Sequence, residues 1–325
     1  MSTVPVIDIA DLFEGGAARL RVARAIGAAC EEIGFFCITG HGVDPKLTDS
    51  VRRVAREFFR LPVERKSLIA RQPPRFRGYV GMGTEGLGRI SGYGVADLKE
   101  AFSMGPVNFP AEPYFTNPEA AAHFEANRWP AHPADFRSVM EDYYRVMTAL
   151  AARLMGGFAL ALDLPEPWFA DKIDRPISNV RVNYYPAQTH APDEGMIRAG
   201  AHTDYGSVTI LLTEESSAGL EVRSLANEWM AIPHRPGHFV VNIGDLMAQW
   251  TNDRFVSTMH RVGNPRAGDL TDRVSVAFFQ QPNYDALIDC IPTCRRAGET
   301  ARYKPITSGD HRRLKLNFAS TGAAA

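Results

Sequence analysis

The sequence predicts a mainly β protein with flanking helices, built as a sandwich or a barrel. Three observations lead to this class. Short strand-like runs alternate with turns over residues 177–291, as they do in sandwiches and barrels. One long helical pattern precedes them at residues 133–162. Residues 1–110 alternate helical and strand-like patterns. We therefore expect a single domain over residues 1–325, with residues 292–325 as a C-terminal tail.

The composition excludes several classes of protein. Of the 325 residues, 45% are hydrophobic and 22% charged, and the formal net charge of −1 gives no global attraction for nucleic acid or an acidic membrane. The N-terminus resembles no signal peptide, and no apolar run is long enough to span a bilayer. We expect a cytoplasmic monomer. We also expect free thiols, because the spacings of the four cysteines fit neither a zinc ribbon nor a disulfide framework. They are Cys30, Cys37, Cys290 and Cys294.

The N-terminal part begins with a short strand over Val4–Ile9. Apolar residues at three- and four-residue steps then predict a helix over Ala17–Ile33, which Gly34 ends. Phe35–Thr39 reads as a buried strand, and a second helix follows over Pro45–Arg60.

Seven glycines predict a long irregular loop over residues 73–94. Gly81–Gly86 spells G-x-G-x-x-G, but no apolar strand leads into it and further glycines follow where a helix should begin. We therefore reject a dinucleotide site. The chain returns to strand over Asp97–Met104.

The long helical pattern, Pro133–Leu162, carries one apolar stripe and should brace a sheet. The strands expected after it are Val180–Tyr185, Val208–Leu212, Leu220–Val222, Phe239–Asn242 and Val274–Gln280.

Two histidines and an aspartate suggest a metal site. His202 and Asp204 are two residues apart, and on a strand such residues point to the same face. His260 would supply a third ligand, since it follows another strand-like run, Phe255–Met259. Two imidazoles and one carboxylate that leave positions open suit Fe(II). An isolated H-x-D is weak evidence, however, because the pattern is common by chance and because an aspartate beside a histidine often only orients it.

An arginine and a serine suggest an anion site. Arg273 and Ser275 are also two residues apart, within the apolar run 273–279. Burying an arginine there is costly unless it meets an anion. Its planar group can donate two parallel hydrogen bonds to a carboxylate, and the serine can add a hydroxyl.

Taken together, these motifs resemble the isopenicillin N synthase-like family of Fe(II)/2-oxoglutarate-dependent dioxygenases. Its pattern of H-x-D, a distant H and R-x-S is matched by His202-Thr203-Asp204, His260 and Arg273-Val274-Ser275. Other blocks of the chain are similar to the family in the same order, namely Val4–Asp8, Gly34–Phe36, His41–Val43, Asn183–Pro186, Val240–Asp245 and Thr251–Phe255.

The resemblance implies a double-stranded β-helix, or jelly-roll, over residues 177–291, with the tail covering its mouth. It implies that His202, Asp204 and His260 bind Fe(II), and that Arg273 and Ser275 hold 2-oxoglutarate. Tyr185 and, less directly, Asn183 would also contact this co-substrate, although Tyr185 could equally be a core tyrosine.

The reaction implied is oxidation of an unactivated C–H bond by dioxygen, with release of succinate and CO2. Hydroxylation is the default, while desaturation or ring closure needs another substrate pose. Two segments would close over the mouth of the jelly-roll, namely the glycine-rich loop of residues 73–94 and the tail of residues 292–325. A solvated face is the plainer explanation of their arginines, yet their number favours a small anionic or amino-acid-like substrate. The candidates are Arg75, Arg77, Tyr79, Arg89 and Tyr93 in the loop, and Arg295, Arg296, Arg302, Arg312 and Arg313 in the tail.

Two alternatives stay open. One is an oxidase of the isopenicillin N synthase type that uses no 2-oxoglutarate. That enzyme has a glutamine ligand near its C-terminus, and no glutamine occurs here after Gln281. The other is a jelly-roll binding protein without catalysis, against which the intact motifs argue. We expect structural or surface roles for the remaining candidates, His41, His190, His234 and His238, and the absence of H-E-x-x-H removes the usual support for a zinc hydrolase.

Overall fold

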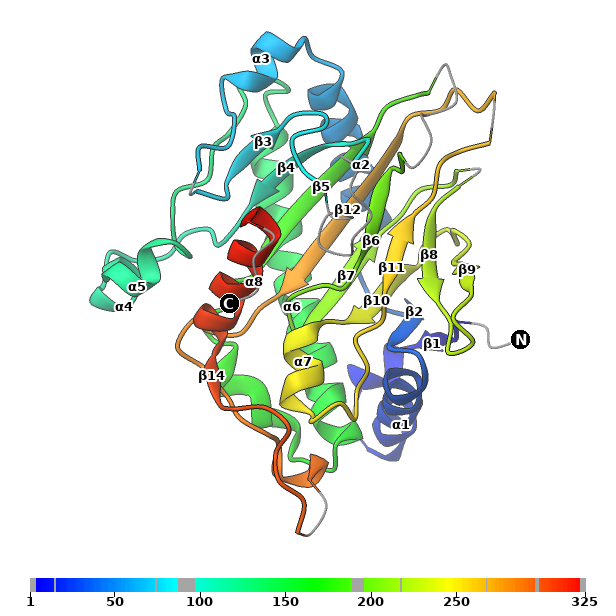
Figure 1. Cartoon of the computed structure of the whole chain (residues 1–325), viewed down its shortest axis with the longest axis vertical. Coiled ribbons are helices and arrows are strands. Elements are labelled where there is room, and N and C mark those ends of the chain that lie inside the picture. Colours follow the sequence, from blue (N-terminus) through cyan, green and yellow to red (C-terminus); the bar gives the residue numbers. More distant parts are fainter. Residues whose placement is uncertain are drawn as a thin grey trace.

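Two β-sheets pack against each other in the centre of the molecule, and helices cover the outer face of the larger one (Figure 1). This computed structural model describes residues 4–14, 16–73, 75–86, 97–188, 196–216, 218–266, 268–295 and 298–321. In spatial order the larger sheet contains β1 (Val6–Asp8), β2 (Phe35–Thr39), β10 (Phe239–Ile243), β7 (Val208–Leu212), β12 (Arg273–Gln280), β5 (Asn179–Tyr185), β4 (Glu100–Met104) and β3 (Gly78–Val80). The smaller contains β6 (Ala199–His202), β11 (His260–Val262), β8 (Leu220–Arg223) and β9 (Trp229–Ala231).

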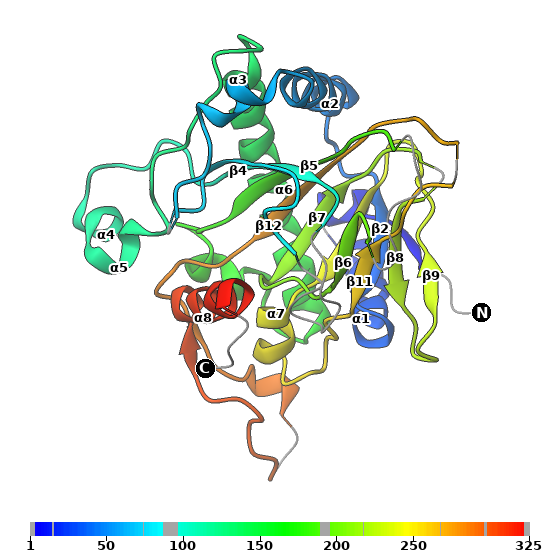
Figure 2. The ribbon, with the colours of Figure 1, turned by 45° about the horizontal axis from the view of Figure 1, so that its top comes forward.

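The helices of the described residues lie around these sheets. They are α1 (Ala17–Glu32), α2 (Pro45–Phe59), α3 (Val63–Ser67), α4 (Pro113–Thr116), α5 (Pro118–Ala121), α6 (Phe136–Ala161), α7 (Asp245–Trp250) and α8 (Ser308–Thr321), and a small ribbon joins β13 (Leu287–Ile288) to β14 (Ile306–Thr307). In both Figure 1 and Figure 2, α8 lies beside α7. None of the described helices is long and apolar enough to cross a membrane.

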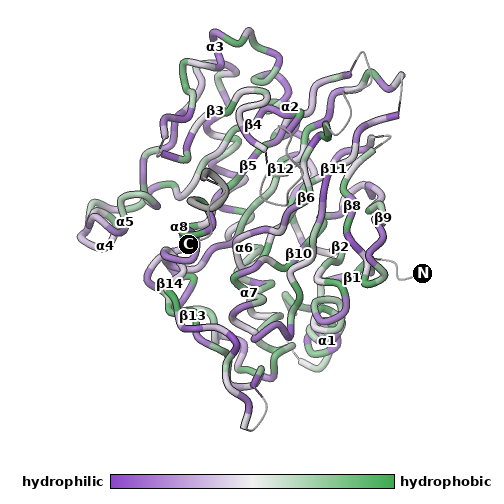
Figure 3. Tube along the Cα trace, in the orientation of Figure 1, coloured by the Kyte–Doolittle hydropathy of each residue, from purple (hydrophilic) through white to green (hydrophobic). Residues whose placement is uncertain are grey.

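The two faces of the larger sheet differ in polarity because side chains alternate along each strand. On β5, Val180 and Val182 join the main core with α6, whereas Arg181 and Asn183 point to the opposite face. Polar and apolar residues alternate along the first five residues of β5, as the hydropathy colouring in Figure 3 shows. The polar face meets the smaller sheet, where Tyr185 of β5 packs against Ala199 and Val262. The space between the sheets is therefore lined by polar side chains of two paired strands, β5 and β12.

Most expected elements occur. The five strands expected between residues 180 and 280 match β5, β7, β8, β10 and β12 to within one residue at each end. Helices α1 and α2 each end one residue early, and α6 begins at Phe136 instead of Pro133. β1 is shorter than expected, and β4 begins at Glu100 because Asp97 and Lys99 form a buried ion pair ahead of it. All four cysteines are free, as expected.

Two expectations about local structure are wrong. Residues 256–259 form no strand, because their polar groups bond to the end of α1: Val256 donates to the Cys30 carbonyl and Thr258 to the Ile33 carbonyl. The glycine-rich segment is not irregular throughout, since β3 lies within it and pairs with β4. A strand therefore does lead into Gly81–Gly86, whose residues form a turn. Residues 74 and 87–96 lie outside the described residues.

Candidate active site

One group of metal-ligating side chains stands out among the described residues. His202, Asp204 and His260 each offer one ligand atom, and the three atoms lie within 4.8 Å of one another. His202 ends β6, His260 begins β11, and the two residues are cross-strand partners. Each Nε2 lies close to Asp204 Oδ1, at 3.8 Å for His202 and 3.7 Å for His260.

Asp204 reaches this cluster by a route that the strand argument did not predict. β6 ends at His202, so Asp204 lies in the following loop and not on the strand. The Asp204 carbonyl accepts a hydrogen bond from the Asp245 N–H at 2.7 Å, which fixes the loop against the start of α7. The three side chains converge as expected, but a loop contact and not strand periodicity brings the carboxylate there.

Backbone carbonyls orient both imidazoles. The Nδ1 atom of His202 lies 2.7 Å from the Gly200 carbonyl, and that of His260 lies 3.0 Å from the Thr258 carbonyl. A carbonyl only accepts, so Nδ1 carries the proton and donates. The lone pair of each ring is then on Nε2, which faces the cluster, as metal-ligating histidines require.

Two side chains hold the Asp204 carboxylate in the same way. Its Oδ2 atom accepts from Thr209 Oγ1 at 2.5 Å and from Asn242 Nδ2 at 2.8 Å. Thr209 of β7 and Asn242 of β10 are themselves cross-strand partners. Because Oδ2 accepts these hydrogen bonds, Oδ1 faces the two imidazoles. The larger sheet thus determines which carboxylate oxygen points into the cluster.

The charges of the cluster suit a cation. Burial and the neighbouring His260 lower the pKa of His202 to about 4, so its imidazole is neutral. Burial alone would raise the pKa of Asp204, but His260 and His202 lower it below its usual range. Burial also opposes charge on His260, while Asp204 raises its pKa above the usual value. A carboxylate with two imidazole nitrogens on one side is the donor set of non-haem Fe(II) sites with open positions, so these residues fit Fe(II).

The polar pair on β12 lies where the sequence predicted it. Arg273 is the cross-strand partner of Tyr185, and Ser275 is the partner of Asn183. Arg273 is 2% exposed, and its Nε and Nη1 atoms have no hydrogen-bond partner in the described structure. A desolvated guanidinium with unused donors is costly in a folded chain. This end of the space between the sheets is therefore suited to an anion.

Tyr185 and Asn183 both face this space. The Tyr185 ring centroid is 5.2 Å from the guanidinium carbon of Arg273, and the ring also belongs to the small core between the sheets. Asn183 Oδ1 accepts from Arg181 Nε at 3.2 Å. The contacts of Tyr185 thus fit a core residue and a neighbour of the anion site at once.

Several charged residues near the cluster carried no signal in the sequence. The Glu85 carboxylate accepts hydrogen bonds from Arg181 and from Arg71, and its Oε1 atom lies 2.6 Å from Arg71 Nη1. Asp97 pairs with Lys99 at 2.7 Å and accepts from the Gly200 N–H at 3.0 Å, which anchors β6 two residues before His202. Glu85, Asp97 and Lys99 come from the connection between β3 and β4, and only the fold brings them to the site.

The arginines expected to bind substrate are mostly engaged elsewhere. Arg77 is buried and donates to the His123 carbonyl, and Tyr79 lies in the core with its hydroxyl on Glu100. In the tail, Arg302 pairs with Asp253, Arg313 pairs with Asp310, and buried Arg312 contacts His123. Arg75 and Arg295 are exposed, whereas Arg89, Tyr93 and Arg296 lie outside the described residues. The expected set of free cations is therefore not present among the described members.

The remaining histidines have the structural or surface roles expected. His41 bridges the Gly237 carbonyl and the Val43 N–H, and packs against Phe239. His234 contacts Thr213 Oγ1, and half-buried His238 contacts the Pro236 carbonyl. His190 lies outside the described residues.

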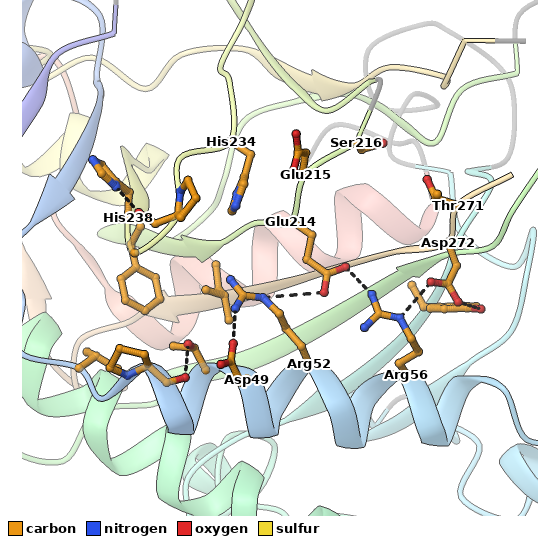
Figure 4. A pocket seen from close by; sticks show the side chains of 18 of the residues that line it. Asp49, Arg52, Arg56, Glu214, Glu215, Ser216, His234, His238, Thr271 and Asp272 are labelled. Atoms are coloured by element: carbon orange, nitrogen blue, oxygen red, sulfur yellow. Dashed lines mark hydrogen bonds and ion pairs between the residues drawn. The ribbon is translucent and has the colours of Figure 1, made fainter. Parts of the chain in front are cut away.

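A cavity of about 1170 Å³ lies beside α2, and none of the three cluster residues lines it. Figure 4 shows Arg52 and Arg56 of α2 directed toward Glu214 and Asp272 across it. Because Arg52 and Arg56 already pair with carboxylates of the cavity wall, they are not free to bind an anion there.

Comparison with known proteins agrees with this geometry. Residues 4–132 match the model of the non-haem dioxygenase N-terminal region in morphine synthesis, and residues 176–282 match that of the 2OG-Fe(II) oxygenase superfamily. The chain is 35% identical to homoarginine-6-hydroxylase 2-ODD-233 of Oryza sativa subsp. japonica, over 92% of this chain and 90% of that protein. It is 34% identical to the proline hydroxylase buaE of Petromyces alliaceus, over 85% and 86% of the two chains.

A solved structure extends the likeness to the fold. A full-length protein of Neurospora crassa, in complex with alpha-KG (2-oxoglutarate) and thymine, superposes with a TM-score of 0.85 at 29% identity, covering 97% of this chain and 96% of that one. Its fold contains the jelly-roll core that the sequence predicted for this chain. The protein belongs to the 2OG-Fe(II) oxygenase superfamily and is an Fe(II)- and 2-oxoglutarate-dependent oxidoreductase.

Proposed function

We propose that this enzyme hydroxylates an unactivated C–H bond of a small, amino-acid-like molecule. The observation that carries the proposal is the coexistence of an oriented His202–Asp204–His260 cluster and a buried Arg273 with unused donors. The first suits Fe(II) and the second suits the distal carboxylate of 2-oxoglutarate. Desaturation or ring closure would need only a different substrate pose.

Each residue has a proposed role in this reaction. His202 and His260 would bind the metal through Nε2 and Asp204 through Oδ1, the atoms that the hydrogen bonds leave available. Arg273 and Ser275 would hold the distal carboxylate, and Tyr185 and Asn183 would line the same space. When bound, Fe(II) with 2-oxoglutarate and dioxygen supplies an oxidant strong enough to remove a hydrogen atom from carbon, with succinate and CO2 as co-products. The protein's own work is to orient the reactants and exclude water.

Relatives support the same class without fixing the substrate. The two relatives compared above are named for homoarginine and proline, and both compounds are amino acids. The thymine bound to the Neurospora crassa protein is not an amino acid, so the fold also accommodates other small molecules.

We also propose a single catalytic domain whose tail, from residue 292 onward, covers the mouth. The contact of Lys315 on α8 with Asp245, at 2.7 Å, supports this role. Four free thiols support a reducing compartment such as the cytoplasm. A monomer remains our expectation.

Succinate release tests the proposal. Purified protein with Fe(II), 2-oxoglutarate and air would be offered free amino acids, beginning with homoarginine, arginine and proline, together with thymine as a neutral comparison. We expect succinate to rise with one of the amino acids, and mass spectrometry of that amino acid to show a gain of one oxygen. Stimulation by thymine alone would contradict the substrate class, and no succinate under any condition would favour an oxidase that uses no 2-oxoglutarate.

A further inference from the structure

A second buried arginine lies at the same end of the space between the sheets as Arg273. Arg198 directly precedes β6 and is 0% exposed. Its guanidinium carbon is 5.6 Å from the centroid of the Tyr185 ring, the ring that Arg273 approaches to 5.2 Å. Two cations, one in β12 of the larger sheet and one just before β6 of the smaller sheet, therefore converge on one aromatic side chain.

Arg198, like Arg273, has donors without partners. Its Nη1 atom donates to Ser216 Oγ at 3.2 Å, and its backbone N–H donates to Asn264 Oδ1 at 3.1 Å. Its Nε and Nη2 atoms have no hydrogen-bond partner within the described residues. Together with Nε and Nη1 of Arg273, four buried guanidinium nitrogens are left without acceptors in this part of the chain.

Electrostatics makes this arrangement unfavourable without an anion. Burial lowers the pKa of Arg198, and the positive charge of Arg273 lowers it further. Among the described residues neither arginine forms an ion pair, and the more distant carboxylate of Asp269 only partly opposes these effects on Arg198. A cavity of about 470 Å³ reaches Arg273 and Ser216, the serine that Arg198 contacts, so there is room for a ligand. Ser216 also lies on the edge of the larger cavity in Figure 4.

We propose that Arg198 is a second cation for the distal carboxylate of 2-oxoglutarate, and that it acts with Arg273 as a specificity-determining residue for a dicarboxylate co-substrate. The proposal deepens the function proposed above and rests on it. One carboxylate has two oxygens and about four acceptor sites, enough to engage both guanidinium groups and the Ser275 hydroxyl. The anion would also relieve the repulsion between the two cations.

A pair of ligands separates this role from a packing role. 2-Oxoglutarate and 2-oxopentanoate share the metal-chelating end and the chain length, but only the first has a distal carboxylate. The dissociation constant of each would be measured by anaerobic titration of the Fe(II)-loaded protein, using the visible charge-transfer band. For the wild type we expect a strong preference for 2-oxoglutarate.

Arg198→Gln should weaken 2-oxoglutarate by roughly tenfold or more and leave 2-oxopentanoate unchanged, because the lost partner acts only on the distal carboxylate. Arg198→Lys should lose part of the same preference, since an ammonium cannot reproduce the two-pronged donor, and it serves as the second variant if the glutamine variant does not fold. Arg254→Gln is the control, because Arg254 already pairs with Glu31 at 2.7 Å and does not line the cavity at Arg273. It should alter neither constant.

The possible failures can be told apart. Equal weakening of both ligands in either Arg198 variant, or no weakening of 2-oxoglutarate, would overturn the proposal and leave Arg198 a structural residue. If the wild type itself does not distinguish the two ligands, or binds neither, the proposed function fails first.

Discussion

The two ends of the space between the sheets differ in how far the protein itself satisfies the hydrogen bonds of their side chains. At the metal end, each coordinating side chain is already hydrogen-bonded through the atom that the metal does not need: both Nδ1 atoms contact carbonyls, and Asp204 Oδ2 accepts from Thr209 and Asn242. At the arginine end, Arg273 and Arg198 are buried with donors that find no acceptor among the described residues. The protein's own hydrogen bonds orient the metal-binding side chains, whereas they leave several guanidinium donors of the two arginines without acceptors.

This difference indicates what each ligand must contribute. A metal ion depends on exact donor geometry, so the protein fixes the ligand atoms beforehand through a shell of hydrogen bonds. A carboxylate is held by charge and by bidentate hydrogen bonds, so the protein can supply desolvated cations and let the ligand complete them. Variants at the metal end should therefore affect metal affinity, whereas variants at the arginine end should affect the co-substrate alone.

The largest expected effect is at the metal ligands. His202→Ala should abolish stoichiometric Fe(II) binding and turnover, because only two donors remain. Asp204→Glu should also fail, since one extra methylene displaces the carboxylate by more than a productive site tolerates. Iron content after anaerobic gel filtration measures both variants. His238→Ala is the control, because His238 is half-buried, contacts the Pro236 carbonyl and lies outside the cluster. Undiminished iron binding by His202→Ala would end the assignment.

Next comes the arginine end. Arg273→Gln should weaken 2-oxoglutarate by roughly one to three orders of magnitude, from a loss of about 2–5 kcal/mol at about 1.4 kcal/mol per tenfold. Fe(II) affinity should stay the same, because Arg273 contacts none of the ligands. Titration of the Fe(II)-loaded variant with 2-oxoglutarate gives the first value, and metal titration gives the second. A parallel fall in both affinities would break the separation between the two ends.

A smaller effect is expected from the residues that orient Asp204. Thr209→Val removes a hydroxyl while nearly preserving shape, and should lower Fe(II) affinity by roughly 10- to 100-fold, as loss of such partners does in metal sites. Thr213→Val is the matched control, because Thr213 is also buried and contacts His234 instead of a ligand. Equal metal affinities for the two valine variants would show that the hydrogen bond to Oδ2 does not matter.

The sequence predicted which residues of the candidate site lie together better than it predicted the contacts that place them. Arg273 and Ser275 lie on one strand because apolar neighbours at alternate positions define β12, and that pattern is visible in the sequence. The fold also brings the three metal candidates together as one group. Asp204, however, is placed by a loop contact with Asp245, and residues 256–259 are placed by hydrogen bonds to the end of α1. Contacts between segments that are distant in sequence leave no periodic pattern.

The same limit explains the arginines. Charged residues in the glycine-rich segment and the tail suggested free cations, yet Arg77 is buried under the His123 carbonyl, and Arg302 and Arg313 have acidic partners. Conversely, the sequence gives no sign of a role for Arg198 or Glu85, because Arg198 belongs to no recognisable motif and the G-x-G-x-x-G match around Glu85 suggests a different chemistry. Whether a charge is paired or unpaired depends on the tertiary structure, and this is the property that decides its function.

Ser275→Ala sharpens the comparison at the arginine end. The hydroxyl would contribute one hydrogen bond to the carboxylate, worth about 1 kcal/mol, so the affinity for 2-oxoglutarate should fall about fivefold. The change should be confined to ligands with a distal carboxylate, so 2-oxopentanoate serves as the internal control in the same titration. A loss as large as that of Arg273→Gln would mean that the serine supports the strand and not only the ligand.

The smallest effect tests whether the tail belongs to the metal end. Lys315 on α8 contacts Asp245, which also accepts from Ser257 and Thr203 next to the ligands. The ion pair is partly exposed, so Lys315→Met should change the unfolding free energy by less than about 1 kcal/mol in urea titration. Fe(II) affinity should hardly change, because Asp245 keeps its other partners. Arg313→Met, which breaks the exposed pair with Asp310, is the control. A clear loss of Fe(II) affinity in Lys315→Met alone would make α8 part of the metal-binding structure, and the cover proposed here would then also help to set the ligands.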